Sequence, residues 1–205
     1  MKVLHINQSD IFGGAAIASH RLHKGLLSQG IESKMLVEIK KTKSNHIEQI
    51  IRKRNLENLI SRIPYYFGLS YIGHFSTFKI PEYSFYQQSD ILNLHNLHGD
   101  YFNYLALPKL TKEKPAVWTL HDMWSFTGHC AYSYDCKKWQ SGCGNCPYLD
   151  VVPVIPRDNT AVEWRLKNWI YQCSNIAIVT LSNWLTELTK KVCLVTFQFI
   201  TFPMV

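Results

Sequence analysis

The 205-residue sequence lacks an apolar run long enough to cross a bilayer. The longest, residues 192–205, is shorter than the roughly 20 residues of a spanning helix and is interrupted by Thr196, Gln198 and Thr201. Near the amino terminus, the run 3–6 contains His5 and is shorter than the core of a secretory signal peptide. We therefore expect a cytoplasmic protein that does not span a membrane.

Acidic residues are also scarce, with 15 Asp and Glu against 22 Lys and Arg, which gives a formal net charge of +7. Nucleic acid, lipid headgroups and phosphorylated sugars are the anionic partners that such a charge favours. Internal repeats and low-complexity segments are missing as well. With 46% hydrophobic and 18% charged residues, the chain has an ordinary globular composition and a length that suits one core.

The dinucleotide-binding pattern G-x-G-x-x-G is absent, although paired glycines do follow the first apolar segment. The sequence there is Phe12-Gly13-Gly14-Ala15, so NAD or FAD binding is disfavoured. Gly13 and Gly14 stand where a predicted strand passes into a predicted helix, and there a phosphate can approach backbone N–H groups at the positive helix end. A tight turn that needs small residues is the alternative explanation.

What is present is a regular alternation of strand-like and helix-like segments. Residues 2–6 predict a buried strand, residues 15–29 a helix, and residues 31–37 a second strand. Such a β-α-β unit typically opens a doubly wound fold. Further strands are predicted at 91–94, 116–120 and 176–181, and further helices at 101–110, 160–173 and 183–191. The predicted fold class is α/β, with a Rossmann-like, doubly wound and mostly parallel sheet.

The segment 47–63 combines apolar residues at three- and four-residue intervals with many Lys and Arg side chains, and Tyr65, Tyr66 and Phe67 follow it. A basic amphipathic segment of this kind can lie on an anionic membrane, with its aromatic rings at the headgroup level. That interpretation predicts peripheral contact with the inner face of the plasma membrane. Packing on the sheet with a solvated basic face is the other interpretation.

Two polar clusters follow predicted parallel strands. They consist of His95, Asn96 and His98 after strand 91–94, and of His121, Asp122 and Trp124 after strand 116–120. Open α/β sheets place their ligand crevice at the carboxyl ends of the strands. A histidine there can donate to a phosphate or a sugar hydroxyl, or act as a base. Together with Gly13, these clusters predict one common site.

Four of the six cysteines fall in one short segment, at Cys130, Cys136, Cys143 and Cys146. Because the cytosol is reducing, thiols or metal ligands are expected there more often than disulfides. Four thiolates in a short loop suit a tetrahedral structural zinc, and C-x2-C is the usual chelating half of such a site. Four thiolates would leave no open position for catalysis. Two disulfides or free thiols are the alternatives.

The longest motif, TLHDMWSFTGHC, spans residues 119–130 and is followed by GCGNCP at 142–147. It is accompanied by LHNLHG at 94–99, by VLHI at 3–6 with Gly13-Gly14-Ala15, and by DNT at 158–160 with Trp164. With these separated motifs, the sequence from residue 1 to about residue 191 resembles the family-4 glycosyltransferases of bacterial surface-polysaccharide pathways, in particular the colanic-acid and capsule type.

This resemblance implies a GT-B architecture, of which the chain holds the amino-terminal, acceptor-side half. It also implies transfer of a sugar from a nucleotide-sugar donor to a lipid-linked or polysaccharide acceptor, with retention of configuration and without a cofactor in the reaction. By matching position, Gly13 and Gly14 would approach the donor diphosphate. His121, with Asp122, would sit beside the reacting sugar and polarise groups near the leaving phosphate. The acceptor side would be lined by His95, Asn96, His98 and Trp124.

The resemblance ends near residue 191. We therefore expect a domain over residues 1–191, with its cysteine-rich loop at 128–147, then an apolar tail at 192–205 from truncation or a frameshift. Without a nucleotide-sugar domain, the chain alone is expected to be inactive. One alternative is a subunit of a split glycosyltransferase. The other is a non-catalytic zinc-bearing module for nucleic acid or protein, but the basic residues at 40–62 are not interleaved with stacking aromatics, so no nucleic-acid partner is expected.

Overall fold

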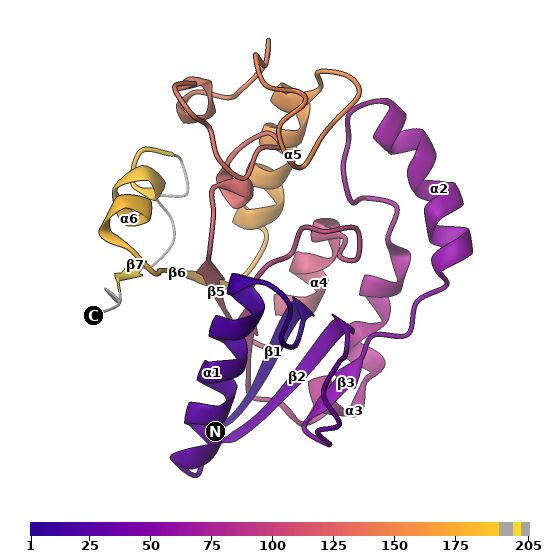
Figure 1. Ribbon diagram of the computed structural model, residues 1–205, viewed down its shortest axis with the longest axis vertical. Helices are drawn as coiled ribbons and strands as arrows, with labels where there is room; N and C mark the ends of the chain where they lie inside the picture. The colour runs from indigo at the N-terminus through magenta and orange to yellow at the C-terminus, as the bar shows by residue number, and fades with distance from the viewer. Residues whose placement is uncertain (193–198, 202–205) are drawn as a thin grey trace.

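The computed structural model describes residues 1–192 and 199–201, which form a parallel sheet surrounded by helices (Figure 1). The strands are β1 (Lys2–Ser9), β2 (Glu32–Ile39), β3 (Ile47–Gln49), β4 (Ile91–Leu94), β5 (Ala116–Leu120), β6 (Ile176–Thr180) and β7 (Phe199–Thr201). The α-helices are α1 (Gly14–Ser28), α2 (Arg54–Tyr66), α3 (Ser84–Gln88), α4 (Leu107–Thr111), α5 (Thr160–Gln172) and α6 (Asn183–Thr189). Short 3-10 helices are η1 (Phe75–Glu82), η2 (Tyr104–Ala106), η3 (Trp124–Phe126) and η4 (Lys138–Gln140).

The strand order β3-β2-β1-β4-β5-β6-β7 makes the fold doubly wound. Every neighbouring pair of strands is parallel. The order reverses between β1 and β4, and ligand crevices of such sheets open at the carboxyl ends of the strands beside this reversal. The predicted α/β, Rossmann-like fold class is confirmed, and its reversal point marks where a site is expected.

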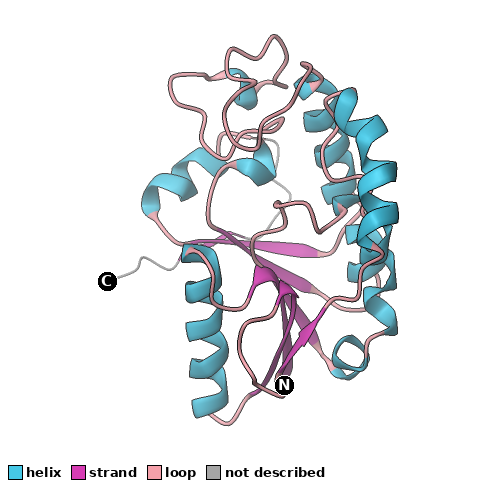
Figure 2. Ribbon diagram, turned by 45° about the vertical axis from the view of Figure 1, so that its right-hand side comes forward, coloured by secondary structure: helices cyan, strands magenta, loops and turns pink. Residues whose placement is uncertain are grey.

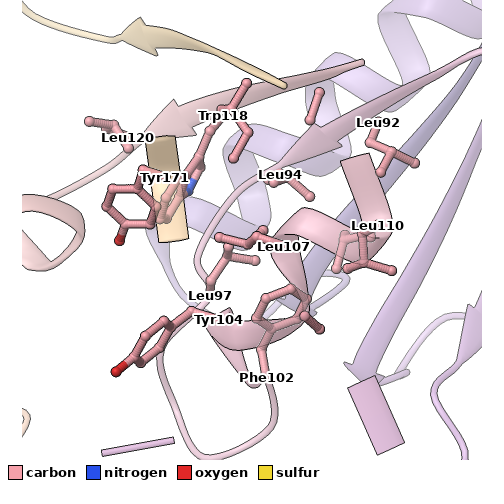
Figure 3. Packing of buried hydrophobic residues seen from close by; sticks show 14 of the residues in the cluster. Leu92, Leu94, Leu97, Phe102, Tyr104, Leu107, Leu110, Trp118, Leu120 and Tyr171 are labelled. Atoms are coloured by element: carbon pink, nitrogen blue, oxygen red, sulfur yellow. The ribbon is translucent and has the colours of Figure 1, made fainter. Parts of the chain in front are cut away.

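Helices cover both faces of the sheet, with α1 on one side and a row of other helices on the opposite side (Figure 2). Most residues of the six strands β1 to β6 whose burial is described are buried or partly buried, as in a parallel sheet covered on both faces. Figure 3 shows the largest core cluster, in which apolar side chains of the sheet meet those of the η2–α4 segment and α5. The labelled members are Leu92, Leu94, Leu97, Phe102, Tyr104, Leu107, Leu110, Trp118, Leu120 and Tyr171.

Three predicted elements differ from the structure. The segment 47–63 is not one element, because β3 takes its first residues and α2 begins only at Arg54. The helix predicted at 101–110 is a short 3-10 turn followed by α4, since Asn103 caps the turn and a proline lies in the first turn of α4. The expected apolar tail lies mostly outside the described residues, and its residues 199–201 form β7 beside β6. None of the described helices is long and apolar enough to cross a membrane.

Candidate active site

The loops that follow β4 and β5 meet at the carboxyl edge of the sheet, where they bring the two predicted polar clusters together. The Nδ1 atom of His95 lies 3.2 Å from Nε2 of His121. The Nε2 atom of His98 lies 2.7 Å from a carboxylate oxygen of Asp122. Asn96 lines the same small pocket as these four residues. The structure therefore joins the clusters through two side-chain pairs, one imidazole–imidazole and one imidazole–carboxylate.

Asp122 also shapes its own loop. Its second oxygen accepts a hydrogen bond of 2.9 Å from the backbone N–H of Trp124, at the start of η3. The indole ring of Trp124 is buried, with its centroid 5.6 Å from that of His98. Among the predicted residues, His98, His121, Asp122 and Asn96 are thus partly exposed to the pocket, while His95 and Trp124 lie beneath it.

Burial favours the neutral form of two histidines of this pocket, His95 and His121. Burial lowers the pKa of His121, although the neighbouring Asp122 carboxylate opposes the shift. His95 is buried, and burial together with the adjacent His5 and His121 holds its pKa well below the usual range. Neutral imidazoles can orient hydroxyl and phosphate oxygens through hydrogen bonds without repelling a second histidine. The arrangement is therefore suited to positioning polar ligands more than to carrying positive charge.

Sequence reasoning missed Asn7, which ties the ends of β1 and β4 together. Its side-chain oxygen accepts hydrogen bonds from the backbone N–H groups of Gln8 (2.9 Å) and Asn96 (3.2 Å). Its amide nitrogen donates to Ser19 Oγ in α1 (2.8 Å) and to the carbonyl of Ser9 (3.1 Å). A polar residue at the end of a buried strand was the available signal. Asn7 fixes the loop that carries Asn96 at the reversal point of the sheet.

The predicted diphosphate residues lie on the loop after β1. Gly13 adopts a left-handed backbone conformation, with φ of 90°, immediately before α1, and Gly14 is the first residue of that helix. Both are exposed, and a side-chain carbon added to either would meet no atom within 4 Å. The first turn of α1 contains no acidic residue and no side-chain cap, so its positive end is free of a competing negative group. The glycines share the sheet edge with the histidines but do not line the histidine pocket.

A buried lysine on α5 supports the loop that follows Asp122. The Nζ atom of Lys167 donates to the carbonyl oxygens of Trp124 (2.9 Å) and Thr127 (3.1 Å) and lies 3.8 Å from the centre of the Trp124 ring. Burial lowers the pKa of Lys167 to about 8, against the effect of Glu163 one helical turn earlier. Burial likewise raises the pKa of Glu163 to about 7. The sequence offered only their spacing of four residues, which is common on exposed helix faces.

The thiols of the cysteine-rich loop line one cavity, and they belong to Cys130, Cys136, Cys143 and Cys146. The N–H of Gly128 donates to the sulfur of Cys143 over 3.2 Å. His129 donates from Nδ1 to the carbonyl of Pro153 (2.8 Å), and its Nε2 lies 3.4 Å from the sulfur of Cys146. A histidine anchored in this way directs the lone pair of Nε2 toward the thiols, as metal-binding histidines do.

The donor set of this loop therefore fits zinc, which prefers thiolate and imidazole ligands. Within the described part of the chain, however, no three His, Cys, Asp or Glu side chains already stand in an arrangement that could hold a metal ion. Metal binding would require these side chains to move closer together. Asp158 links this loop to α5, since its oxygens accept from the N–H groups of Cys146 (2.6 Å) and Thr160 (3.1 Å).

Comparison with known proteins decides the family. Residues 12–196 match the model of Glycosyltransferase Family 4. The chain belongs to the family-4 glycosyltransferases. It is also similar to the WcaC protein of Escherichia coli (strain K12), whose name records a proposed glycosyl transfer in colanic acid biosynthesis, with 28% identity over 175 residues. The alignment covers 77% of this chain and 42% of WcaC, so the chain spans less than half of that relative.

The family-4 match includes both polar clusters, the cysteine-rich loop and α5. It begins just before Gly13, so β1 and its residue Asn7 lie outside the matched range. The predicted family is confirmed by this match. The roles of individual residues in binding the donor, the acceptor or a metal remain predictions.

Proposed function

We propose that this family-4 glycosyltransferase supplies the acceptor side of a reaction that moves a sugar from a nucleotide-sugar donor to a lipid-linked or polysaccharide acceptor, with retention of configuration. One observation carries the proposal. The pairs His95–His121 and His98–Asp122 meet at the carboxyl ends of β4 and β5, beside the reversal point of the sheet. Similarity to WcaC favours a surface polysaccharide as the product.

Each residue then has a defined task. His121, which is neutral and partly exposed, hydrogen-bonds the reacting sugar or its leaving phosphate. Asp122 orients His98 from a distance of 2.7 Å, and His98 with Asn96 binds hydroxyls of the acceptor. The positive end of α1 receives the donor diphosphate at Gly13 and Gly14. Four polar side chains and a helix end can position substrates without any metal or cofactor in the reaction.

Turnover in this proposal also requires a nucleotide-binding half, supplied by the same polypeptide or by a partner chain. The extent of WcaC beyond the aligned region supports this division of labour. We expect the 205-residue chain to bind a short polyprenyl-diphosphate saccharide in micelles, with little affinity for UDP- or GDP-sugars. Titration calorimetry measures both affinities, and a radiolabelled donor measures transfer.

His98→Ala is expected to weaken saccharide binding up to about tenfold, because a hydrogen bond to a neutral hydroxyl contributes about 0.5–1.5 kcal/mol. Gln29→Ala, at the opposite end of α1, is the matched control and should leave affinity unchanged. No saccharide binding by the wild-type chain would contradict the acceptor-side assignment. Sugar transfer by the purified 205-residue chain would contradict the need for a second half.

We also infer that α2 rests on an anionic membrane, because this helix buries a charged side chain and exposes its apolar ones. Glu57 is fully buried, and its oxygens accept hydrogen bonds of 2.7 Å from the side chain of Arg52 and from the N–H of Ser76. The apolar residues Leu59 and Ile63 are instead 60% and 69% exposed. An exposed apolar stripe on a helix held by a buried carboxylate supports contact with another apolar phase.

The basic residues beside the apolar stripe favour an anionic lipid surface as the partner that covers it. Lys53 and Arg62 are exposed on the same helix segment, and Arg54 is exposed but ion-paired with Glu38 over 2.8 Å. Tyr66 and Phe67 extend the stripe at its end. Figure 1 shows α2 at the margin of the molecule, where a flat surface can reach it. Each basic residue near an anionic membrane contributes about 1 kcal/mol, and aromatic rings favour the headgroup region.

Co-sedimentation with vesicles tests this contact. The wild-type chain should bind vesicles that contain phosphatidylglycerol and bind pure phosphatidylcholine weakly. The double variant Leu59→Glu with Ile63→Glu should lower partitioning at least about 100-fold, since each buried aliphatic side chain contributes roughly 1.5–3 kcal/mol. Leu22→Glu replaces a comparably exposed residue of α1 and should change little. Equal partitioning of all three proteins would refute the role of α2.

For the cysteine-rich loop, we propose a structural zinc held by the thiolates of Cys130, Cys136, Cys143 and Cys146. The common cavity of these thiols supports it. Elemental analysis of the purified chain should find about one zinc per molecule, as a closed four-ligand site requires. Cys143→Ser should abolish that zinc, whereas Cys173→Ser, which alters an exposed cysteine outside the loop, should retain it. A metal-free wild-type protein that keeps its fold would refute the site.

A further inference from the structure

A line of buried polar side chains leads away from His121 across the sheet. Beyond the contact of His121 with His95, the Nε2 atom of His95 lies 3.1 Å from Nδ1 of His5, in the middle of β1. The same Nδ1 atom lies 3.1 Å from the side-chain oxygen of Asn93 in β4. His5, Asn93 and His95 are all buried. Each ring nitrogen in this line must therefore be satisfied by its neighbours, because water does not reach it.

Asn93 determines the direction of the hydrogen bonds. Its amide nitrogen donates to the backbone carbonyl of Val117 (3.4 Å) and to Thr119 Oγ1 (3.3 Å). A carbonyl can only accept, so the amide nitrogen must face Val117 and the amide oxygen must face His5. An amide oxygen is also only an acceptor. The proton of neutral His5 must therefore reside on Nδ1.

The position of the His5 proton determines the proton positions of the two histidines nearer the pocket. The Nδ1–H group of His5 faces both Asn93 and Nε2 of His95, which makes that Nε2 an acceptor and places the proton of His95 on Nδ1. The Nδ1–H group of His95 then donates to Nε2 of His121. With its Nε2 lone pair engaged, a neutral His121 carries its own proton on Nδ1. No hydrogen-bond partner for that Nδ1 occurs among the described residues, and the ring is partly exposed to the pocket.

The hydrogen bonds at the other end of the line run in the same direction. The Nε2 atom of His5 is an acceptor by the argument above, so the hydroxyl of Ser33 donates to it over 3.1 Å. Ser33 in turn accepts from Nδ1 of His23, on α1, over 2.7 Å. All donors along His23, Ser33, His5, His95 and His121 therefore point toward the pocket. Five groups, on α1, β2, β1 and the loops after β4 and β5, thus share one direction, which a single amide imposes.

We propose that Asn93 and His5 are positioning residues that set the tautomer of His121, so that it presents an Nδ1–H donor to an oxygen of the bound saccharide or phosphate. The benefit to the reaction rests on the proposed function of the pocket, while the tautomer itself is a property of the free chain. A donor of fixed direction is an organised group at a site where negative charge develops, which is the condition for electrostatic stabilisation. His121 in this state is not a general base through Nε2, because that atom is engaged by His95.

Long-range ¹H–¹⁵N correlation spectra of the 205-residue chain, labelled with ¹⁵N-histidine, read each tautomer directly. His121→Gln identifies the signals of His121. We expect His121 to show a protonated Nδ1 and an unprotonated Nε2, the reverse of the form that predominates in free histidine. His121 predominantly protonated at Nε2 would overturn the proposal. Because no substrate is present, failure of saccharide binding would leave this result unaffected, so the two proposals fail separately.

Asn93→Leu removes the group that sets the direction while keeping a side chain of similar size. In this variant the Nε2–H form of His121 should become populated, with a change of ¹⁵N shifts that a general loss of packing does not produce. His20→Gln, which alters a histidine outside the line, should leave the His121 signals unchanged. A folded Asn93→Leu protein with an unaltered His121 tautomer would overturn the role of Asn93. If that variant fails to fold, the wild-type tautomer still decides the proposal.

Discussion

Replacement of Lys167 by Met should destabilise the protein severely, although Lys167 does not line the histidine pocket. The change removes two charge-assisted hydrogen bonds to the carbonyls of Trp124 and Thr127 and the cation above the Trp124 ring. It also removes the nearby positive charge that partly offsets the burial of Glu163. Hydrogen bonds to charged groups contribute about 1.5–3 kcal/mol each. We expect a loss of about 3–5 kcal/mol.

Urea unfolding followed by tryptophan fluorescence measures this loss as a fall in the midpoint at constant slope. The matched control is the double variant Glu163→Leu with Lys167→Met, which replaces both charges with apolar groups of similar volume. Such replacements are often neutral or stabilising, so the double variant should recover much of the lost stability. A loss below about 1 kcal/mol in the single variant, or no recovery in the double variant, would refute the pairing.

Two further predictions concern neighbouring groups. Burial raises the pKa of Glu163 from 4.5 to about 7, so the stability from its protonated form is complete below pH 4.5 and is lost as the pH rises through about 7. Relative to Glu163→Gln, the wild type should lose about 3 kcal/mol of unfolding free energy over that interval, and parallel pH profiles would disprove this. In Gly128→Ala, the new carbon would lie 2.5 Å from Cβ of Thr160, so a loss of about 1–3 kcal/mol is expected in thermal unfolding. Gly25→Ala meets no atom within 4 Å and should be neutral or slightly stabilising, and an equal loss in both variants would exclude crowding as the cause.

The sheet could be predicted from the sequence because buried parallel strands are short apolar runs with clear ends. Four of the five predicted strands correspond closely to β2, β4, β5 and β6, and the first extends further than expected, to Ser9. The three-residue strand β3 was missed, since so short a segment has no detectable period. Its neighbour α2 has a strong period, but the period does not reveal which face is buried. Only the structure shows that Glu57 is inside and Ile63 outside.

The residues of the candidate site that directly follow strands could be predicted from the sequence. His95 and His121 follow β4 and β5 directly, so parallel pairing brings them together. His5 and Asn93 lie within strands, and a polar residue in an apolar run does not disclose its partner on the neighbouring strand. Lys167 is missed for another reason, because a lysine on a helix is ordinarily solvated. Its burial depends on how the loop after β5 folds over α5, which no local pattern encodes.

Asn7 has a consequence for the thermodynamics of ligand binding. A side chain with four hydrogen bonds joins β1, α1 and the backbone of Asn96, so this loop loses little conformational freedom when a ligand arrives. Most loops at such crevices must be ordered by the ligand itself, at a cost in affinity. Here the ordering is complete at the end of folding. Because the Asn96 loop is ordered in the unliganded chain, a ligand that binds there does not have to offset the entropy of ordering it.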